Sequence, residues 1–254
     1  MIAILSPAKT LDFDRDYQLN EYTIPDFMPE SECLIEELKA YKPKELSNLM
    51  SISPSLSDLN FQRYQAWDTH FDLSNSKQSI LCFKGGVYVG LNVDSFSKSD
   101  LTYAQNYLRI LSGLHGVLRP FDLIKPYRLE MGTKLKNKNG KNLYDFWGDK
   151  ITNLINNNLQ ESSSEFLLNL ASNEYFSSLN SEKISRSIVD VKFLDEKNGV
   201  YKIISFFAKK ARGAMAAFLI KNKIKKINDL KDFTDLGYAF NKERSDKNTL
   251  VFIR

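Results

Sequence analysis

Short apolar runs that alternate with polar segments are the main pattern of this chain. Five runs of four to eight residues are rich in Ile, Leu, Val or Phe, and polar or turn-forming residues bound them, which predicts buried strands. We expect these strands at residues 2–5, 79–83, 108–111, 166–170 and 201–208. Residues 189–194 should pair with the last of them as a hairpin, because Asn198-Gly199 between them favours a tight turn.

Apolar residues at helical spacing lie between these strands. Leu34, Ile35 and Leu38 share one face of a helix that follows Ser31. Pro43 and the Ser53-Pro54 pair mark the starts of two more helices. We also expect helices at residues 101–107, 143–157 and 214–220. The mixture of hairpins and strand–helix units predicts a mixed α/β fold, in which a mixed sheet is flanked by helices.

A single compact domain, residues 1–254, is the organisation that the composition favours. No linker rich in Ser, Gly or Pro divides the 254 residues, and 43% of them are hydrophobic. No apolar run approaches the ~20 residues of a membrane span and the N-terminus lacks a signal-peptide pattern, so we expect a cytoplasmic protein without a membrane partner. Cys33 and Cys82 form no C-x-x-C pair and should be reduced packing residues.

Charge is distributed unevenly along the chain. Residues 1–50 hold 5 Lys and Arg against 10 Asp and Glu, whereas residues 201–254 hold 13 against 5. The polar segments that follow the predicted strands contain Lys, Arg or Asn, and ligands of such sheets bind beyond the carboxyl ends of the strands. The sequence therefore predicts a positively charged cleft whose ligand is an anion.

Lys209-Lys210-Ala211-Arg212-Gly213 is the strongest single signal for that ligand. If a strand ends here and a helix begins, three cations meet free backbone N–H groups and the positive end of the helix dipole, which is an arrangement suited to phosphate. A second basic segment carries Arg119 and Arg128, whose guanidinium groups suit phosphate; Arg128 could instead pair with Glu130 or Glu174. The segments at 6–10 and 84–86 lack the spacing of a P-loop or a dinucleotide motif.

Candidates for acid–base chemistry are few. His70 and His115 are the only histidines, and neither has metal-ligand spacing around it, so we expect no metal and no cofactor. Glu174, Glu130 and His115 are the candidate catalytic residues, because nearby cations would tune a carboxylate and His115 follows a predicted strand. No reaction can be assigned from these residues.

Several long motifs resemble the bacterial YaaA family of peroxide stress proteins, and the likeness covers essentially the whole chain. These motifs are Ile4–Asp12, Phe83–Gly85, Leu111–Gly113, Leu118–Pro120, Pro126–Gly132, Phe146–Gly148, Asn169–Ser172 and Ala208–Gly213. The resemblance implies an unusual single-domain α/β fold, sequence-independent binding of double-stranded DNA, and a role in limiting DNA damage and iron load under hydrogen peroxide. It also implies a helix-hairpin-helix element, for which residues 43–67 are the best carrier; Ser51 and Ser53 stand where such hairpins usually have glycine.

The preferred hypothesis is thus a DNA-binding protein of the peroxide response. Its expected phosphate ligands are Lys9, Lys84, Arg119, Arg128, Asn173, Lys209, Lys210 and Arg212. An alternative is an enzyme that acts on a nucleotide, a nucleobase or another small anion in the same cleft. A third possibility is an interaction or iron-sequestering protein.

Overall fold

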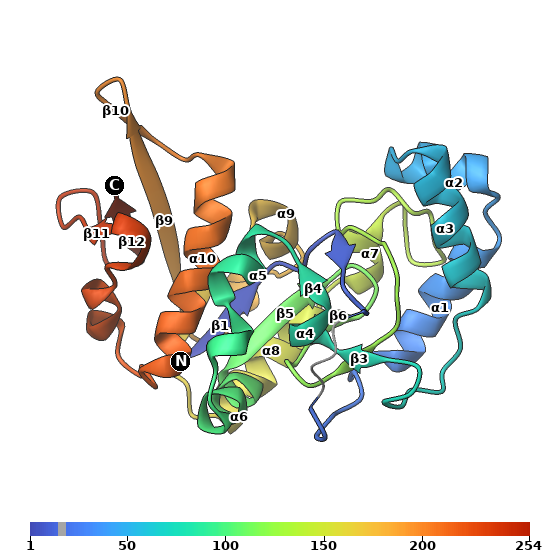
Figure 1. Ribbon diagram of the computed structural model, residues 1–254, viewed down its shortest axis with the longest axis horizontal. Coiled ribbons are helices and arrows are strands. Elements are labelled where there is room, and N and C mark those ends of the chain that lie inside the picture. Colours follow the sequence, from blue (N-terminus) through green and yellow to red (C-terminus); the bar gives the residue numbers. More distant parts are fainter. Residues whose placement is uncertain (15–18) are drawn as a thin grey trace.

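A mostly parallel sheet forms the centre of the molecule (Figure 1). The computed structural model describes residues 1–14 and 19–254. Within them, five neighbouring strands run parallel in the order β12-β9-β8-β1-β5, and β6, β10 and β11 pair antiparallel at the margins. The strands are β1 Ile2–Leu5, β5 Leu108–Ser112, β6 Gly116–Leu118, β8 Phe166–Leu170, β9 Ser187–Lys197, β10 Val200–Lys202, β11 Ala239–Phe240 and β12 Thr249–Ile253.

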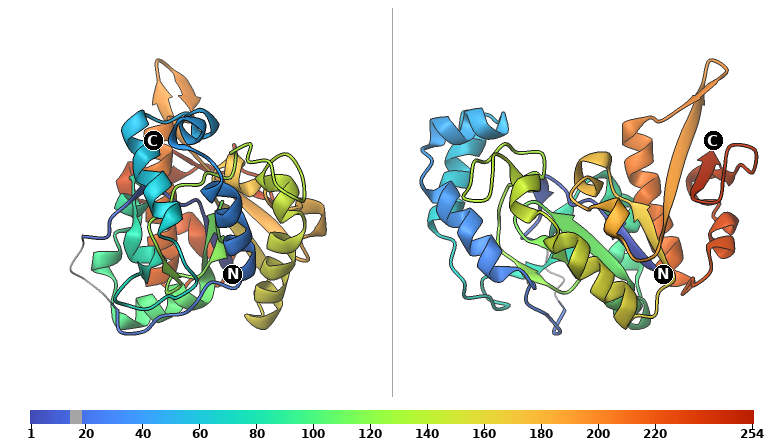
Figure 2. Two further views of the ribbon diagram at one scale, coloured as in Figure 1. Left: turned by 90° about the vertical axis from the view of Figure 1, so that its right-hand side faces the viewer. Right: turned by 180° about the vertical axis from the view of Figure 1, so that it is seen from behind.

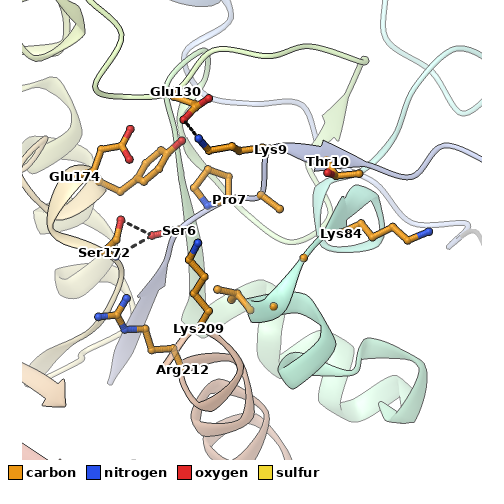
Figure 3. Close-up of a pocket in the computed structure, with 15 residues that line it drawn as sticks. Ser6, Pro7, Lys9, Thr10, Lys84, Glu130, Ser172, Glu174, Lys209 and Arg212 are labelled. Carbon is orange, nitrogen blue, oxygen red and sulfur yellow. Dashed lines mark hydrogen bonds and ion pairs between the residues drawn. The ribbon is translucent and has the colours of Figure 1, made fainter. Parts of the chain in front are cut away.

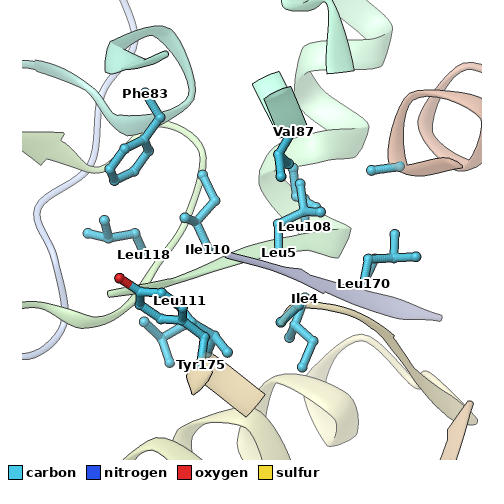
Figure 4. Packing of buried hydrophobic residues seen from close by; sticks show 14 of the residues in the cluster. Ile4, Leu5, Phe83, Val87, Leu108, Ile110, Leu111, Leu118, Leu170 and Tyr175 are labelled. Atoms are coloured by element: carbon cyan, nitrogen blue, oxygen red, sulfur yellow. The ribbon is translucent and has the colours of Figure 1, made fainter. Parts of the chain in front are cut away.

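The burial of the central strand β1 shows that the sheet is covered on both faces. All four of its residues are fully buried, as expected for a parallel strand with helices on both faces. Figure 4 shows Ile4 and Leu5 packed among side chains of β5, β8 and α5. By contrast, buried and more exposed residues alternate along β9, so one of its faces is less covered.

Helices lie on both faces of the sheet (Figure 2). Helices α5 and α10 cover one face, and α8 covers the other. The helices are α1 Met28–Lys39, α2 Pro43–Met50, α3 Pro54–Gln65, α4 Ser79–Cys82, α5 Gly86–Leu91, α6 Lys98–Tyr107, α7 Leu143–Trp147, α8 Lys150–Glu161, α9 Asn173–Phe176 and α10 Ser205–Lys221, with short 3-10 turns at Val93–Ser95, Ser181–Lys183, Ile227–Asp232 and Asp235–Gly237. Two small two-stranded sheets complete the fold: β2 Thr10–Leu11 with β4 Phe83–Lys84, and β3 Lys77–Gln78 with β7 Leu123–Ile124.

A close contact between α5 and α10 fixes the position of α10. A Cβ atom added to Gly213 would lie 1.7 Å from the backbone oxygen of Val87, and one added to Gly90 would lie 1.9 Å from that of Lys210. Neither position can therefore accept a side chain without moving a backbone. The two glycines allow the helices to touch backbone to backbone, and α10 carries the basic residues singled out above.

The fold class is confirmed: this is a mixed α/β structure in a single compact domain. The strands expected at 2–5, 108–111 and 166–170 are present as β1, β5 and β8, and the hairpin turn at Asn198-Gly199 joins β9 to β10. The helices expected behind Ser31, at Pro43, at Pro54 and at residues 101–107 are present as α1, α2, α3 and α6; α6 begins earlier than expected, directly after its N-cap Ser97. None of the described helices is long and apolar enough to cross a membrane.

Two predicted strands are wrong. Residues 79–82 form the single turn α4, and Phe83 begins the short strand β4 outside the central sheet. The backbone N–H groups of Ser79 and Ile80 bond to the carbonyls of Asp122 and Pro120 rather than to the central sheet. Residues 201–208 leave the sheet after Lys202, and α10 begins at Ser205. A short apolar run fits either element by its pattern alone.

One predicted helix is divided. Residues 143–157 form α7 and α8, which meet at Gly148 with a φ of 48°, and α8 continues to Glu161. The loop expected between Leu11 and Pro29 ends where α1 begins at Met28, and its residues 15–18 lie outside the described part of the chain.

Candidate functional site

A cavity of about 270 Å³ lies beyond the carboxyl ends of β1 and β8 (Figure 3). Its walls come from four parts of the chain that are distant in sequence: the loop after β1, the start of α5, the segment around Glu130, and the loop after β8; α10 closes the remaining side. The lining residues are Ser6, Pro7, Ala8, Lys9, Thr10, Lys84, Gly85, Gly86, Val87, Glu130, Ser172, Glu174, Tyr175, Lys209 and Arg212.

Two serines join the neighbouring strand ends at the floor of the cavity. β1 and β8 are adjacent and parallel, so Ser6 and Ser172 leave the sheet side by side. The hydroxyl of Ser6 donates to Ser172 Oγ over 3.2 Å and accepts from the Ser172 backbone N–H over 2.8 Å. The buried hydroxyl of Tyr88 donates to the backbone carbonyl of Ser6 over 3.2 Å, which holds that loop from behind.

Lys209 and Arg212 project into the cavity from one face of α10, three residues apart (Figure 3). Neither side chain has an acidic partner or a hydrogen bond within the described residues. Burial lowers the pKa of the Arg212 guanidinium, because the charge has lost water without gaining a counter-ion. The cavity therefore contains two cationic groups that no described residue neutralises.

Glu130 lies between two cations on the opposite wall. Its carboxylate accepts from Lys9 Nζ over 2.5 Å and from Arg128 Nη2 over 2.9 Å. Arg128 does not line the cavity itself, but Glu130 connects it to Lys9. The interior pairing of Arg128 with Glu130, which the sequence left as an alternative to phosphate binding, is the arrangement found.

The remaining charged lining residues are held by other contacts. Lys84 pairs with Asp12 over 2.9 Å, and that ion pair keeps the pKa of Asp12 below its usual value. Glu174 accepts from the backbone N–H of Gly132 over 3.0 Å and has no ion pair within the described residues. Tyr175 lines the cavity below it, and burial raises the pKa of its phenol.

Six of the residues expected at the site line the cavity, and five do not. Lys9, Lys84, Lys209, Arg212, Glu130 and Glu174 come together there. Arg128 lies behind Glu130, and the exposed Asn173 lies between two lining residues. Lys210 is half-buried, with its backbone against Gly90. His115 and Arg119 lie elsewhere.

Arg119 and His115 have structural partners. The guanidinium of Arg119 binds Asp122 over 3.0 Å and Asp26 over 3.4 Å, and it donates to the carbonyl of Ile24. His115 is fully buried, and its Nδ1 lies 2.8 Å from the hydroxyl of Ser31. Burial lowers the pKa of His115 to about 3, so its ring is neutral at pH 7.

The basic element at 209–213 has a different local setting from the one expected. It is not a strand-to-helix junction: Lys209 follows a complete first turn of α10, so free N–H groups at the helix start do not contribute there. Neither serine is among the phosphate ligands and catalytic candidates expected from the sequence. Ser6 directly follows β1, Ser172 lies two positions after the end of β8, and these two strands are neighbours in the sheet.

Helices α2 and α3, at residues 43–65, lie together with α1 at one end of the molecule (Figure 1). Ser51 ends α2 with a φ of 52°, and Ser53 caps α3 by accepting from the Leu56 N–H. Two helices joined by a short turn are thus present within residues 43–67; the helix-hairpin-helix element and its use in DNA binding stay predictions.

Within the described residues, no group of three His, Cys, Asp or Glu side chains is placed to hold a metal.

The chain also matches a known protein family. The model of one family, described as peroxide stress protein YaaA, matches residues 1–244. That match spans every wall of the cavity and nearly the whole sheet, and the chain therefore belongs to the YaaA family of peroxide stress proteins.

Proposed function

We propose that this protein is a cytoplasmic DNA-binding protein of the peroxide stress response, which protects DNA from oxidative damage and limits iron. The observation that carries the proposal is the pair Lys209 and Arg212, two cations of the cavity that have no ion pair within the described residues. Lys9 and Lys84 lie on the same cavity with 64% and 65% of their side chains exposed, so each can exchange its carboxylate for a phosphate.

Phosphate contacts of this kind do not depend on base sequence. Arg119 and Arg128 are excluded from the expected contact set, because their guanidinium groups already bind carboxylates inside the protein. With about 4–6 phosphates neutralised, the logarithm of the affinity should fall with the logarithm of the salt concentration at a slope of about −4 to −5.

A duplex-binding titration at several salt concentrations tests the proposal. Lys209→Gln and Arg212→Gln should each weaken binding to unrelated duplexes to the same degree and reduce the salt slope by about 1. Lys221→Gln is the matched control, since Lys221 is exposed on the same helix about 18 Å further along its axis. Equal effects of all three variants, or binding without salt dependence, would rule out the cavity as the phosphate contact.

The α2–α3 pair is the second proposed DNA contact. Its turn exposes Ser51 and Ser53, so a phosphate could approach the start of α3 without displacing an apolar side chain. Ser51→Asp would place a negative charge at that turn. We expect at least a severalfold loss of duplex affinity; an unchanged affinity would assign DNA binding to the cavity alone.

Protection from peroxide follows from the same contacts. Phosphates that the protein neutralises release their counter-ions, and ferrous ions held at those phosphates would leave with them. Plasmid DNA exposed to ferrous iron and peroxide should thus be cleaved less in the presence of the protein. Lys209→Gln/Arg212→Gln should lose that protection, while Lys221→Gln keeps it.

An enzyme acting on a nucleotide, nucleobase or other small anion is the second candidate. The observation that favours it is the volume of about 270 Å³, which is near the size of small-molecule sites and far too small for a duplex. Glu174, without an ion pair, is then the candidate acid or base. Product formation from a panel of nucleotides, abolished by Glu174→Gln, would establish it.

A further inference from the structure

Three side-chain hydrogen-bond donors, on α10 and at the floor of the cavity, have no acceptor within the described residues. These are the Arg212 guanidinium, the Lys209 ammonium and the hydroxyl hydrogen of Ser172, whose oxygen already accepts from Ser6. We infer that the cavity binds the phosphomonoester group of a nucleotide, carried either by a free nucleotide or by the end of a DNA strand. The second source rests on the proposed DNA-binding function; the first does not.

Charge is the first argument for a monoester. A phosphomonoester carries about −1.5 to −2 charges at pH 7, whereas each phosphate within a DNA strand carries −1. Lys209 and Arg212 supply two positive charges that no described carboxylate offsets by an ion pair. A dianion balances both charges, whereas a single backbone phosphate leaves one positive charge unbalanced; burial already disfavours the charged form of Arg212.

The shapes of the donors support the same ligand. A guanidinium presents a planar fork that binds two oxygens of one phosphate, and an ammonium binds a third as a point charge. Figure 3 shows Lys209 extending towards Ser6 and Arg212 extending on the side of Ser172. A terminal phosphate has three unesterified oxygens for these groups, and a phosphodiester has two.

The size of the cavity limits what else can enter. About 270 Å³ is just below the ~300–1,000 Å³ of typical ligand sites. A phosphate with its sugar is of that scale. A strand that entered and continued on the other side would need a larger channel, so a chain end fits better than a chain interior.

The two glutamates of the opposite wall, Glu130 and Glu174, repel such an anion less strongly than two free carboxylates would. Glu130 is neutralised by Lys9 and Arg128. Glu174 is the lining carboxylate without an ion pair within the described residues, and it can accept a hydrogen bond from a sugar hydroxyl or a base amine. The ligand is thus expected to place its phosphate towards α10 and its nucleoside towards Glu174.

Calorimetric titration of the full-length protein tests the inference with defined probes. These are 2′-deoxyadenosine 5′-monophosphate, its methyl phosphodiester and 2′-deoxyadenosine. We expect the monophosphate to bind at least about tenfold more tightly than the diester, and the nucleoside more weakly still. Equal affinities of monophosphate and diester would overturn the inference.

Arg212→Gln and Lys209→Gln should each reduce the monophosphate affinity about tenfold or more, and Ser172→Ala by a smaller factor. Lys221→Gln should change it less than twofold. Circular dichroism and urea unfolding confirm that each variant is folded. If a folded Arg212→Gln variant binds the monophosphate as the unmodified protein does, the assignment is wrong.

Duplexes with different ends distinguish a free nucleotide from a DNA end as the source of the phosphate. They also distinguish this inference from the proposed DNA-binding function. A nicked duplex with a 5′-phosphate should bind more tightly than the same duplex with a 5′-hydroxyl, and the difference should vanish in Arg212→Gln. If the monophosphate binds but no DNA form does, the nucleotide site stands and the proposed DNA function fails. If intact closed circles bind and neither the monophosphate nor the 5′-phosphate adds anything, the DNA function stands and the inference fails.

Discussion

Replacing Gly213 by Ala should destabilise the protein and displace the anion site. In an exposed helix the same change is stabilising by about 1 kcal/mol, because Ala has a much higher helix propensity than Gly. Here the added Cβ would lie 1.7 Å from the Val87 oxygen and 2.7 Å from the Leu91 nitrogen. Ordinary contacts begin near 3.4 Å, so α10 and α5 must separate by roughly 1.5–2 Å.

Both colliding groups are backbone, so no side-chain rotation relieves the contact. Overpacking costs about 1–3 kcal/mol, and the upper part of that range applies when a backbone has to shift. Subtracting the propensity gain leaves a net loss of about 2 kcal/mol in the free energy of unfolding. For a chain of 254 residues this corresponds to a decrease of roughly 4–8 °C in Tm.

Urea unfolding measures the loss, and titration with the nucleoside monophosphate measures the displacement, since Lys209 and Arg212 move with α10. Gly199→Ala is the control: its φ of 76° makes Ala unfavourable, but nothing lies within 4 Å of the added Cβ. The control should lose some stability and keep its affinity. A Gly213→Ala variant that is more stable than the original protein would refute the proposed helix contact.

Three further predictions concern residues outside the cavity wall. His115 has a pKa of about 3 in the folded protein and 6.5 in the unfolded chain, so the free energy of unfolding decreases as the pH falls below 6.5. Between pH 7 and pH 5, urea unfolding should show a loss about 2 kcal/mol larger in the original protein than in His115→Gln. Cys33→Ser with Cys82→Ala should keep peroxide survival, because Cys82 is buried and neither thiol lines the cavity, and a lost phenotype in folded protein would contradict this. Phe206 is 70% exposed beside Lys209, where its ring can stack on a base. Phe206→Ala should therefore weaken single-stranded DNA binding about tenfold, and Phe206→Trp should retain it; equal affinities of the Phe206→Ala variant and the original protein would exclude stacking.

The sequence predicts the elements whose patterns are unambiguous. β1 and β8 are buried on both faces, so their apolar runs are strands in the structure, and the helices that start at Pro43, Pro54 and Ser97 carry their own start signals. The expectation that strand ends gather basic residues corresponds to what is found for Lys9, which follows β1 and lines the cavity. Lys84 lines the same cavity, but it belongs to β4 of a separate two-stranded sheet.

What sequence patterns miss is determined by long-range contacts. Arg119 has the residue type of a phosphate ligand, but Asp122 binds it inside the protein, and the charge pattern does not reveal that partner. For Arg128 the sequence leaves both phosphate binding and pairing with Glu130 open, and the structure shows the pair. Residues 201–208 contain apolar positions throughout, although Ile203 and Phe206 are exposed and the chain changes from strand to helix between them. The closeness of Gly90 and Gly213 has only one trace, a run of small residues along α10.

The contact of α5 with α10 also orders the assembly of the site in time. Gly90 and Gly213 are 123 positions apart, so α5 and the loop after β1 emerge from the ribosome well before the helix that completes their cavity. A nascent chain that stops short of α10 would lack Lys209 and Arg212. Binding of the proposed phosphomonoester would therefore require that synthesis has passed residue 213 and that the two distant parts have docked.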